Sequence, residues 1–354
     1  MKMSIYKFIG IISLVVLLPE FALRTLKRNW IFVRDPGKRP ISSRFYDFEK
    51  IKNIEPHMNC DYLTQEFWDE MQNLTRDRSG LKMVNSRGEK YLVAKDCPGR
   101  FFSVKNNLRT TLFSPNHSTS NCFLFGSSTL HNFEVPDSLT TASNLQKLFS
   151  ASDINLKVHN YGVSGATLEN NFARMLEIEA SFNIGDIIIV LFGINDVGLD
   201  TYPMSEMKIL KVVRKLGEYS LFFRTIHRQL ARTSWTEHAR RTAREKLSLL
   251  ENIFSWSISK NLKFRAILEP VLHLKKNPND YETDLRNTFG QKLEYLYRFG
   301  YEEFLTGLNT NFTSSMIDVF DHTVRSVFLD QAHINAVGTE ILAAKILNLS
   351  ASSL

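Results

Sequence analysis

Cysteine is scarce in this sequence, with three residues in a chain of 354. Cys60, Cys97 and Cys122 leave at least one thiol unpaired, and their spacing is not that of a metal site. Cys60 and Cys97 could form a disulfide in an oxidising compartment, but the sequence leaves open whether their side chains meet. We therefore expect no metal centre, and no motif indicates an organic cofactor.

The chain also lacks an even spread of charge. It carries 44 Lys and Arg against 37 Asp and Glu, a formal net charge of +7. Residues 201–246 hold eleven basic and four acidic residues, so this segment accounts for the whole surplus. A nucleic-acid-binding protein would need a recognition module there, and the segment shows no such motif. We predict no nucleic-acid partner.

A long hydrophobic run free of charge is missing as well. The run at residues 8–18 is shorter than the roughly 20 residues of a membrane-spanning helix. Residues 5–23 reach that length only if Lys7 and Glu20 extend to the two interfaces. The residues that follow lack the small side chains of a signal cleavage site. We predict an uncleaved membrane anchor, a single transmembrane helix in residues 1–28. A cleaved signal peptide and a surface or core helix are the alternatives.

The rest of the chain divides into two regions, without an internal repeat or a low-complexity tract. Residues 29–120 are polar, irregular and punctuated by proline, which predicts a linker followed by a small N-terminal cap that contains β-structure. Residues 121–354 alternate short apolar runs with helical periods, which predicts βαβ units and a parallel sheet. We expect five strands, at residues 122–125, 156–161, 187–192, 264–268 and 316–320. We expect helices at residues 141–150, 168–181, 238–259, 284–297 and 335–349.

Residues 201–259 are longer than a connection between two strands requires. Ile209, Val212, Val213 and Leu216 recur at helical spacing, with Lys and Arg between them. We predict a helical insertion, a hairpin packed on the sheet with a solvated basic face. The alternative is a lid or docking surface for anionic lipid or an acidic polysaccharide.

Polar residues gather where the predicted strands end. Ser128 follows the first strand, and Asp330 precedes His333 by three residues at the entrance of the last helix. An Asp at this spacing can bond one imidazole nitrogen and leave the other free to deprotonate a serine. Because ligands of a doubly wound sheet bind beyond the carboxyl ends of its strands, the pattern predicts a Ser-His-Asp catalytic triad.

Other polar residues compete for roles at this edge. His322 lies beside Asp321 but lacks the three-residue spacing, so we expect it in a surface loop. His131 follows Ser128 by three residues and could contact substrate. Glu269 ends the fourth strand, where it could line the site or only terminate the strand. Asp196 could cap the next segment.

The four loops together resemble those of the SGNH (GDSL-type) hydrolase family, over about residues 122–349. Ser128 matches the family's nucleophile, Gly165 and Asn195 match its oxyanion-hole positions, and Asp330 and His333 match its Asp-x-x-His pair. The resemblance implies a flavodoxin-like three-layer α/β/α sandwich. It also implies that the backbone N–H groups of Ser128 and Gly165 and the amide of Asn195 stabilise the oxyanion.

One position departs from the family pattern. The first motif usually reads Gly-Asp-Ser, and Ser127 stands here in place of the Asp. The tight turn between strand and helix directs the third residue of the motif, so Ser128 remains the expected nucleophile and Ser127 a structural hydroxyl.

The resemblance implies a serine esterase or O-acyl hydrolase, similar to membrane-anchored bacterial members that act on acylated carbohydrate or cell-surface polysaccharide. Lipid ester or thioester hydrolysis and O-acyl transfer are alternatives, because any bound nucleophile can resolve an acyl-enzyme. A non-catalytic binding or assembly module is another. More basic residues follow the apolar N-terminal run than precede it, which favours a cytoplasmic domain. The resemblance favours the extracytoplasmic side, which we expect. The sequence does not indicate an oligomeric state.

Overall fold

The computed structural model describes residues 48–57, 60–75, 80–118, 120–198 and 221–350. The predicted anchor at residues 1–28 and the first part of the predicted insertion, residues 201–220, lie outside this set. No helix within the described residues is long and apolar enough to span a membrane. The chain forms two units, residues 1–38 with 201–238 and residues 39–200 with 239–354. Of the first unit the structure describes residues 221–238, which begin helix α9 (Leu221–Ser259).

The second unit contains a sheet whose core is parallel. Its parallel strands follow the order second, first, third, fourth, fifth along the chain, which is the flavodoxin-like order. The buried apolar runs explain the parallel pairing, because strands covered on both faces need continuous hydrophobic sequence. In spatial order these strands are β7 (Leu156–Gly162), β6 (Ser120–Gly126), β8 (Ile187–Phe192), β9 (Lys263–Leu268) and β10 (Thr313–Ser315).

The prediction of a five-stranded parallel sheet is wrong in extent, because within the described residues the sheet has eight strands and is mixed. Beyond β7 it adds the short antiparallel strands β5 (Leu108–Arg109), β4 (Ser103–Lys105) and β3 (Cys97–Pro98). Strands of two or three residues are too short to produce a detectable alternation of apolar and polar residues. Residues 97–109, assigned to the cap region from the sequence, therefore extend the central sheet.

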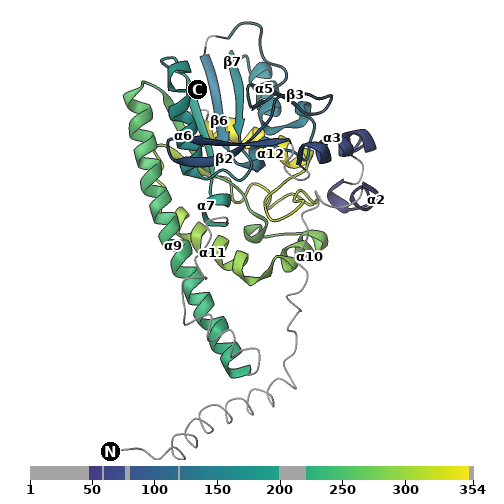
Figure 1. The fold of residues 1–354 in the computed structure, drawn as a ribbon, viewed down its shortest axis with the longest axis vertical. Helices are drawn as coiled ribbons and strands as arrows, with labels where there is room; N and C mark the ends of the chain where they lie inside the picture. Colours follow the sequence, from purple (N-terminus) through teal and green to yellow (C-terminus); the bar gives the residue numbers. More distant parts are fainter. Residues whose placement is uncertain (1–47, 58–59, 76–79, 119, 199–220, 351–354) are drawn as a thin grey trace, which may run out of the picture. The chain divides into compact units, whose positions relative to one another are not determined.

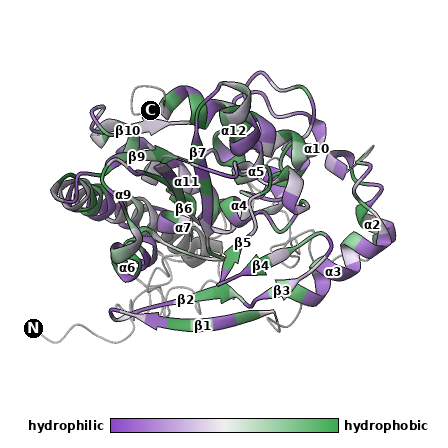
Figure 2. Ribbon diagram, turned by 90° about the horizontal axis from the view of Figure 1, so that it is seen from above, coloured by the Kyte–Doolittle hydropathy of each residue, from purple (hydrophilic) through white to green (hydrophobic). Residues whose placement is uncertain are grey.

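A separate hairpin, β1 (Leu81–Ser86) and β2 (Glu89–Ala94), lies beside this sheet (Figure 2). Its two-residue loop consists of Arg87 and Gly88, both with positive φ, as a type I′ turn requires. Tyr91 and Val93 pack against Val163 and Ala166 of the loop after β7.

Helices cover both faces of the sheet, which is the expected three-layer α/β/α arrangement (Figure 1). One face packs against α6 (Leu168–Glu177), α7 (Ile194–Gly198), α11 (Gly290–Gly307) and the second half of α9. The other packs against α4 (Ser128–His131), α5 (Thr141–Ala151) and α12 (Ala336–Ser350). The described part of the chain also contains helices α2 (Phe48–Ile51), α3 (Gln65–Thr75) and α10 (Asp280–Thr288), with 3-10 turns η2 (Glu55–His57), η4 (Asp137–Leu139), η5 (Glu179–Ser181) and η6 (Leu272–Leu274).

Three boundaries differ from the sequence predictions. The fifth strand is Thr313–Ser315, and residues 316–320 form turns that bury Met316 and Phe320 four residues apart. The helix predicted at 284–297 is two helices, since Asn279 and Glu282 form a capping box that starts α10 and a break at Phe289 ends it. The helix predicted at 238–259 begins earlier, at Leu221, and is continuous to Ser259, while residues 201–220 of the predicted hairpin lie outside the described residues.

Strand β5 also anchors the back of helix α4. The guanidinium of Arg109 donates to the carbonyl oxygens of His131 (3.1 Å), Asn132 (2.8 Å) and Val135 (2.8 Å), and its Nε lies 2.7 Å from Asp137 Oδ1. Gly162 lets α4 approach β7, because a Cβ at this position would lie 2.5 Å from the backbone nitrogen of His131. The element that carries Ser128 is thus fixed from behind by β5 and β7.

Removing the Arg109 side chain should destabilise the fold far more than removing an exposed arginine. Arg109 and Asp137 are almost fully buried, so Arg109→Met leaves an uncompensated carboxylate and should cost about 3–5 kcal/mol of unfolding free energy. Arg240→Met breaks the exposed pair with Glu302 and should cost about 0–1 kcal/mol. Urea unfolding followed by circular dichroism measures both, and equal losses would contradict the anchoring role of Arg109.

Candidate active site

The structure brings Ser128, His333 and Asp330 into one hydrogen-bonded chain. Ser128 Oγ lies 2.8 Å from His333 Nε2, and His333 Nδ1 lies 2.6 Å from Asp330 Oδ2. An ionised carboxylate only accepts hydrogen bonds, so Nδ1 is protonated and donates to Asp330. Nε2 is then unprotonated and accepts the hydrogen bond of the serine hydroxyl. Ser128 and His333 are 205 positions apart in the sequence, and the folded sheet brings them together.

Local structure determines where each of these side chains lies. Ser128 is the first residue of α4, and Ser127 before it is extended, with φ −96°. The other oxygen of Asp330, Oδ1, accepts the backbone N–H groups of Ala332 (2.9 Å) and His333 (2.8 Å), so the carboxylate orders the loop that presents the imidazole. The side chain of His333 is 13% exposed and that of Asp330 is 5% exposed, and Ser128 as a whole residue is 8% exposed. A substrate can therefore reach the imidazole and the serine hydroxyl, and the carboxylate is shielded from solvent.

The predicted oxyanion residues occupy loops at the same edge of the sheet. Gly165 has φ +73°, in the left-handed region that favours glycine, within the loop after β7. Asn195 is in α7 after β8, and its Nδ2 donates to the carbonyl oxygen of Ala166 at 3.0 Å. This bond joins the asparagine to the Gly165 loop. Since the register pairs Gly126 with Gly162 and the strands are parallel, both loops begin level with the α4 turn.

Asp196 was expected to cap the next segment, and it does more. Its Oδ2 accepts the N–H of Gly193 at 2.7 Å and its Oδ1 accepts the N–H of Leu168 at 2.8 Å, so it clamps the loops after β8 and β7 together. Burial raises the pKa of Asp196, an effect that Lys246 and the two N–H groups oppose. Local sequence could not reveal this bridge, because Leu168 lies 28 residues away.

The competing residues lie elsewhere or are held by structural contacts. His322 is exposed in a loop, as expected, while Asp321 is buried and accepts the N–H of Lys276. His131 is buried, its Nδ1 lies 3.1 Å from the carbonyl oxygen of Gly162, and its ring packs on Phe133. It is the last residue of α4, and these contacts hold it in the core.

Glu269, at the end of β9, lies below the α4 turn. Thr129 Oγ1 donates to Glu269 Oε1, and the Thr129 and Ser127 hydroxyl oxygens are 2.8 Å apart. Glu269 is 1% exposed, and its Oε2 has no hydrogen-bond partner within the described part of the chain. Burial raises its pKa to about 8, against the opposing Thr129 hydrogen bond and with a further contribution from the Asp196 charge. The sequence analysis noted this residue only as a strand end or lining residue.

The three thiols and the metal-binding residue types form no further centre in the described residues. Cys60, Cys97 and Cys122 are all free, and the first two donate to the carbonyl oxygens of Pro56 and Phe102. No group of three or more His, Cys, Asp or Glu within the described ranges is arranged to hold a metal ion.

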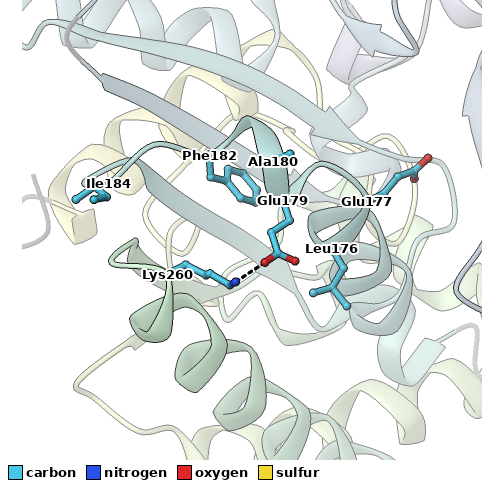
Figure 3. Close-up of a pocket in the computed structure, with 7 residues that line it drawn as sticks. All are labelled: Leu176, Glu177, Glu179, Ala180, Phe182, Ile184 and Lys260. Carbon is cyan, nitrogen blue, oxygen red and sulfur yellow. Dashed lines mark ion pairs between the residues drawn. The ribbon is translucent and has the colours of Figure 1, made fainter.

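A pocket lies at the end of the sheet opposite to Ser128, near the amino ends of the strands (Figure 3). Ile184 and Lys260 of its lining precede β8 and β9, so it opens near the amino ends of the strands, away from Ser128. An ion pair of 2.5 Å between Lys260 Nζ and Glu179 Oε1 crosses it. The pocket is no part of the triad site.

Comparison with known proteins gives only distant likenesses. No protein-family model matches the chain, and no curated protein matches it. An acetyl xylan esterase from Geobacillus stearothermophilus is 19% identical, with a TM-score of 0.35, over 66% of this chain and 94% of that one. A lipase/acylhydrolase from Enterococcus faecalis is 15% identical, with a TM-score of 0.38, over 66% and 96%. TesA is 14% identical, with a TM-score of 0.37, over 66% and 100%. Likeness at this level assigns no activity.

Glu269 should make the stability of the protein depend on pH. Its pKa rises from 4.5 when unfolded to about 8 when folded, so between these values the folded state holds a proton that the unfolded state has lost. Its contribution is therefore complete below about pH 4.5, falls by at most about 1.4 kcal/mol per pH unit, and is lost above about pH 8.

Glu269→Gln removes this dependence. The melting temperature of the variant minus that of the wild type should be larger at pH 8 than at pH 5, as measured by scanning calorimetry. Glu302→Gln, at an exposed position, is the control for removing one negative charge. The same Glu269→Gln difference at both pH values would show that this carboxyl does not titrate in that window.

Proposed function

We propose that this protein is a serine ester hydrolase of the SGNH type, with Ser128 as nucleophile, His333 as base and Asp330 as the residue that orients the base. The observation that carries the proposal is the unbroken chain from Ser128 Oγ through His333 to Asp330, with contacts of 2.8 and 2.6 Å. A serine hydrogen-bonded to an imidazole whose other nitrogen is held by a buried carboxylate is the arrangement that activates a hydroxyl for acyl transfer.

The reaction proceeds in two halves. His333 Nε2 takes the hydroxyl proton as Ser128 Oγ bonds to the ester carbonyl carbon, and the same proton then passes to the departing alcohol oxygen as the ester C–O bond breaks. In the second half His333 takes a proton from water, the resulting hydroxide displaces Ser128 from the acyl group, and the proton returns to Ser128. Asp330 stabilises the imidazolium formed in each half.

The negative charge on the carbonyl oxygen is met by the backbone N–H groups of Ser128 and Gly165 and by the amide of Asn195. One N–H of that amide is directed to Ala166, which orients the group, and the amide carries a second N–H for the oxyanion. Fixed donors of this kind need no reorganisation during the reaction, which is why they lower its barrier.

For the substrate we propose an acylated carbohydrate or cell-surface polysaccharide. This choice rests on the sequence resemblance to anchored bacterial members of the family, as does an extracytoplasmic domain held at the membrane by residues 1–28. Lipid ester or thioester hydrolysis and transfer of the acyl group to a sugar hydroxyl use the same residues. A non-catalytic binding module is the competing function, and it does not require the triad chain.

The nucleophile can be identified by covalent labelling of the full-length protein with a fluorescent fluorophosphonate. We expect wild type and Ser127→Ala to label and Ser128→Ala not to label, because only Ser128 contacts the base. Circular dichroism checks that each variant is folded. A folded wild type that neither labels nor cleaves short-chain aryl esters and acetylated oligosaccharides would favour the binding module.

The contribution of Asn195 can be measured separately. Loss of one oxyanion donor should lower kcat of Asn195→Ala on an aryl acetate by about 100-fold to 1,000-fold, while KM changes little. Steady-state kinetics of purified wild type and variant give both constants. A kcat within a factor of about two of wild type would remove Asn195 from the oxyanion hole.

A further inference from the structure

The nucleophile is flanked on both sides by hydroxyl side chains that connect to a single buried carboxyl. Ser127 precedes Ser128 and Thr129 follows it, and the two hydroxyl oxygens are 2.8 Å apart. When Glu269 is ionised it only accepts, so Thr129 donates its one hydroxyl proton to Glu269 Oε1 and Ser127 donates to Thr129. The hydrogen bonds therefore run in one direction, from Ser127 through Thr129 to Glu269.

Helix α4 requires such support because it is one turn long. It comprises four residues, too few for a stable helix without tertiary contacts. Its N-cap bond, from Thr129 N to Ser127 Oγ, is 3.4 Å, which is longer than the usual range for an N–H···O bond. Arg109 fixes the carbonyl end of this turn, and the amino end, where Ser128 lies, depends on the contacts of Ser127 and Thr129.

Glu269 has no other task in the proposed reaction. Asp330 already orients His333, and Glu269 contacts the turn of the nucleophile through Thr129. The groups that act on Glu269 come from three elements: Thr129 of α4, Asp196 of α7, and Tyr297 and Tyr301 of α11, whose pKa values the Glu269 charge raises further above the level set by burial. A carboxyl placed in such surroundings costs stability, as its raised pKa indicates.

We propose that Glu269 is a positioning residue for the nucleophile, which through Thr129 and Ser127 holds the Ser128 hydroxyl at hydrogen-bonding distance from His333. The proposal rests on the assignment of Ser128 as nucleophile. It makes the end of β9, a strand that carries no triad member, part of the active-site apparatus. A misplacement of about 1 Å at a reacting atom can cost roughly 100-fold in rate, so a clamp on this turn affects turnover more than substrate binding.

The kinetic test removes the chain at Thr129 with little change of volume. Thr129→Val lacks the hydroxyl and should lower kcat on an aryl ester by about tenfold or more, with KM within about twofold. Thr129→Ser keeps the hydroxyl and should stay within about threefold of wild-type kcat. Glu269→Ala should lower kcat as Thr129→Val does, and the double variant should be no worse than either single variant, because both remove the same link.

Asp186→Asn is the matched control. Asp186 is a fully buried carboxylate that accepts the N–H groups of Asn121 and Asn183, each at 2.8 Å, at the amino end of β8. Its variant should keep kcat within about twofold of wild type. A loss as large as that of Thr129→Val, or additive effects in the double variant, would overturn the proposal in favour of general destabilisation.

A second readout does not depend on activity. In NMR spectra of the full-length protein with labelled histidine, the His333 ring resonances should shift in Thr129→Val and remain in place in Thr129→Ser and Asp186→Asn. If the wild type neither labels nor hydrolyses, the proposed function fails, and these spectra still decide whether Glu269 positions Ser128 against His333. Unchanged His333 resonances in Thr129→Val would overturn the positioning role in either case.

Discussion

The site depends on the parallel register of β6 with its two neighbours. Gly126 pairs with Gly162 on β7, and the same strand pairs in parallel with β8, so the chain leaves all three strands at the same edge. β6, the first parallel strand along the chain, has β7 on one side and β8 on the other. In a sheet of this kind the connections that leave neighbouring strands run to opposite faces, which opens a crevice at the carboxyl ends of the strands. Ser128, Gly165 and Asn195 are carried by these three loops, and the loop after β10 adds His333.

Three buried carboxyl groups, each held differently, maintain this edge. Asp330 accepts hydrogen bonds from two backbone N–H groups and from the imidazole, which suits the ionised carboxylate of the proposed triad. Asp196 accepts two backbone N–H groups from different loops and ties them together. Glu269 accepts one hydroxyl and leaves its second oxygen without a hydrogen-bond partner in the described part of the chain, and its burial raises its pKa. The number of hydrogen bonds that each carboxyl accepts thus distinguishes the proposed triad carboxylate, the structural clamp and the group whose pKa is raised.

Sequence reasoning succeeded where the signal is local and strong. The buried runs of β6, β7, β8 and β9 and the start of α5 at Thr141 lie where the pattern of apolar residues predicted them. It failed at β3, β4 and β5, whose two or three residues carry no period, and at residues 316–320, where a short apolar run is buried by turns instead of a strand. A short run shows that residues are buried, and does not show which backbone conformation buries them.

The sequence by itself determined the α/β alternation and the polar residues that follow each strand, including Ser128, Asn195, Asp330 and His333. These properties follow from the order of apolar and polar side chains along the chain, and parallel strands convert that order into proximity at one edge. Only the tertiary structure decided which polar groups meet across the core. Arg109 contacts the carbonyl groups behind α4 from a two-residue strand, and Glu269 meets Thr129 across 140 residues. Such contacts have no sequence signature, because they depend on the burial of polar groups from distant elements, each of which must find its hydrogen-bond partner in the folded core.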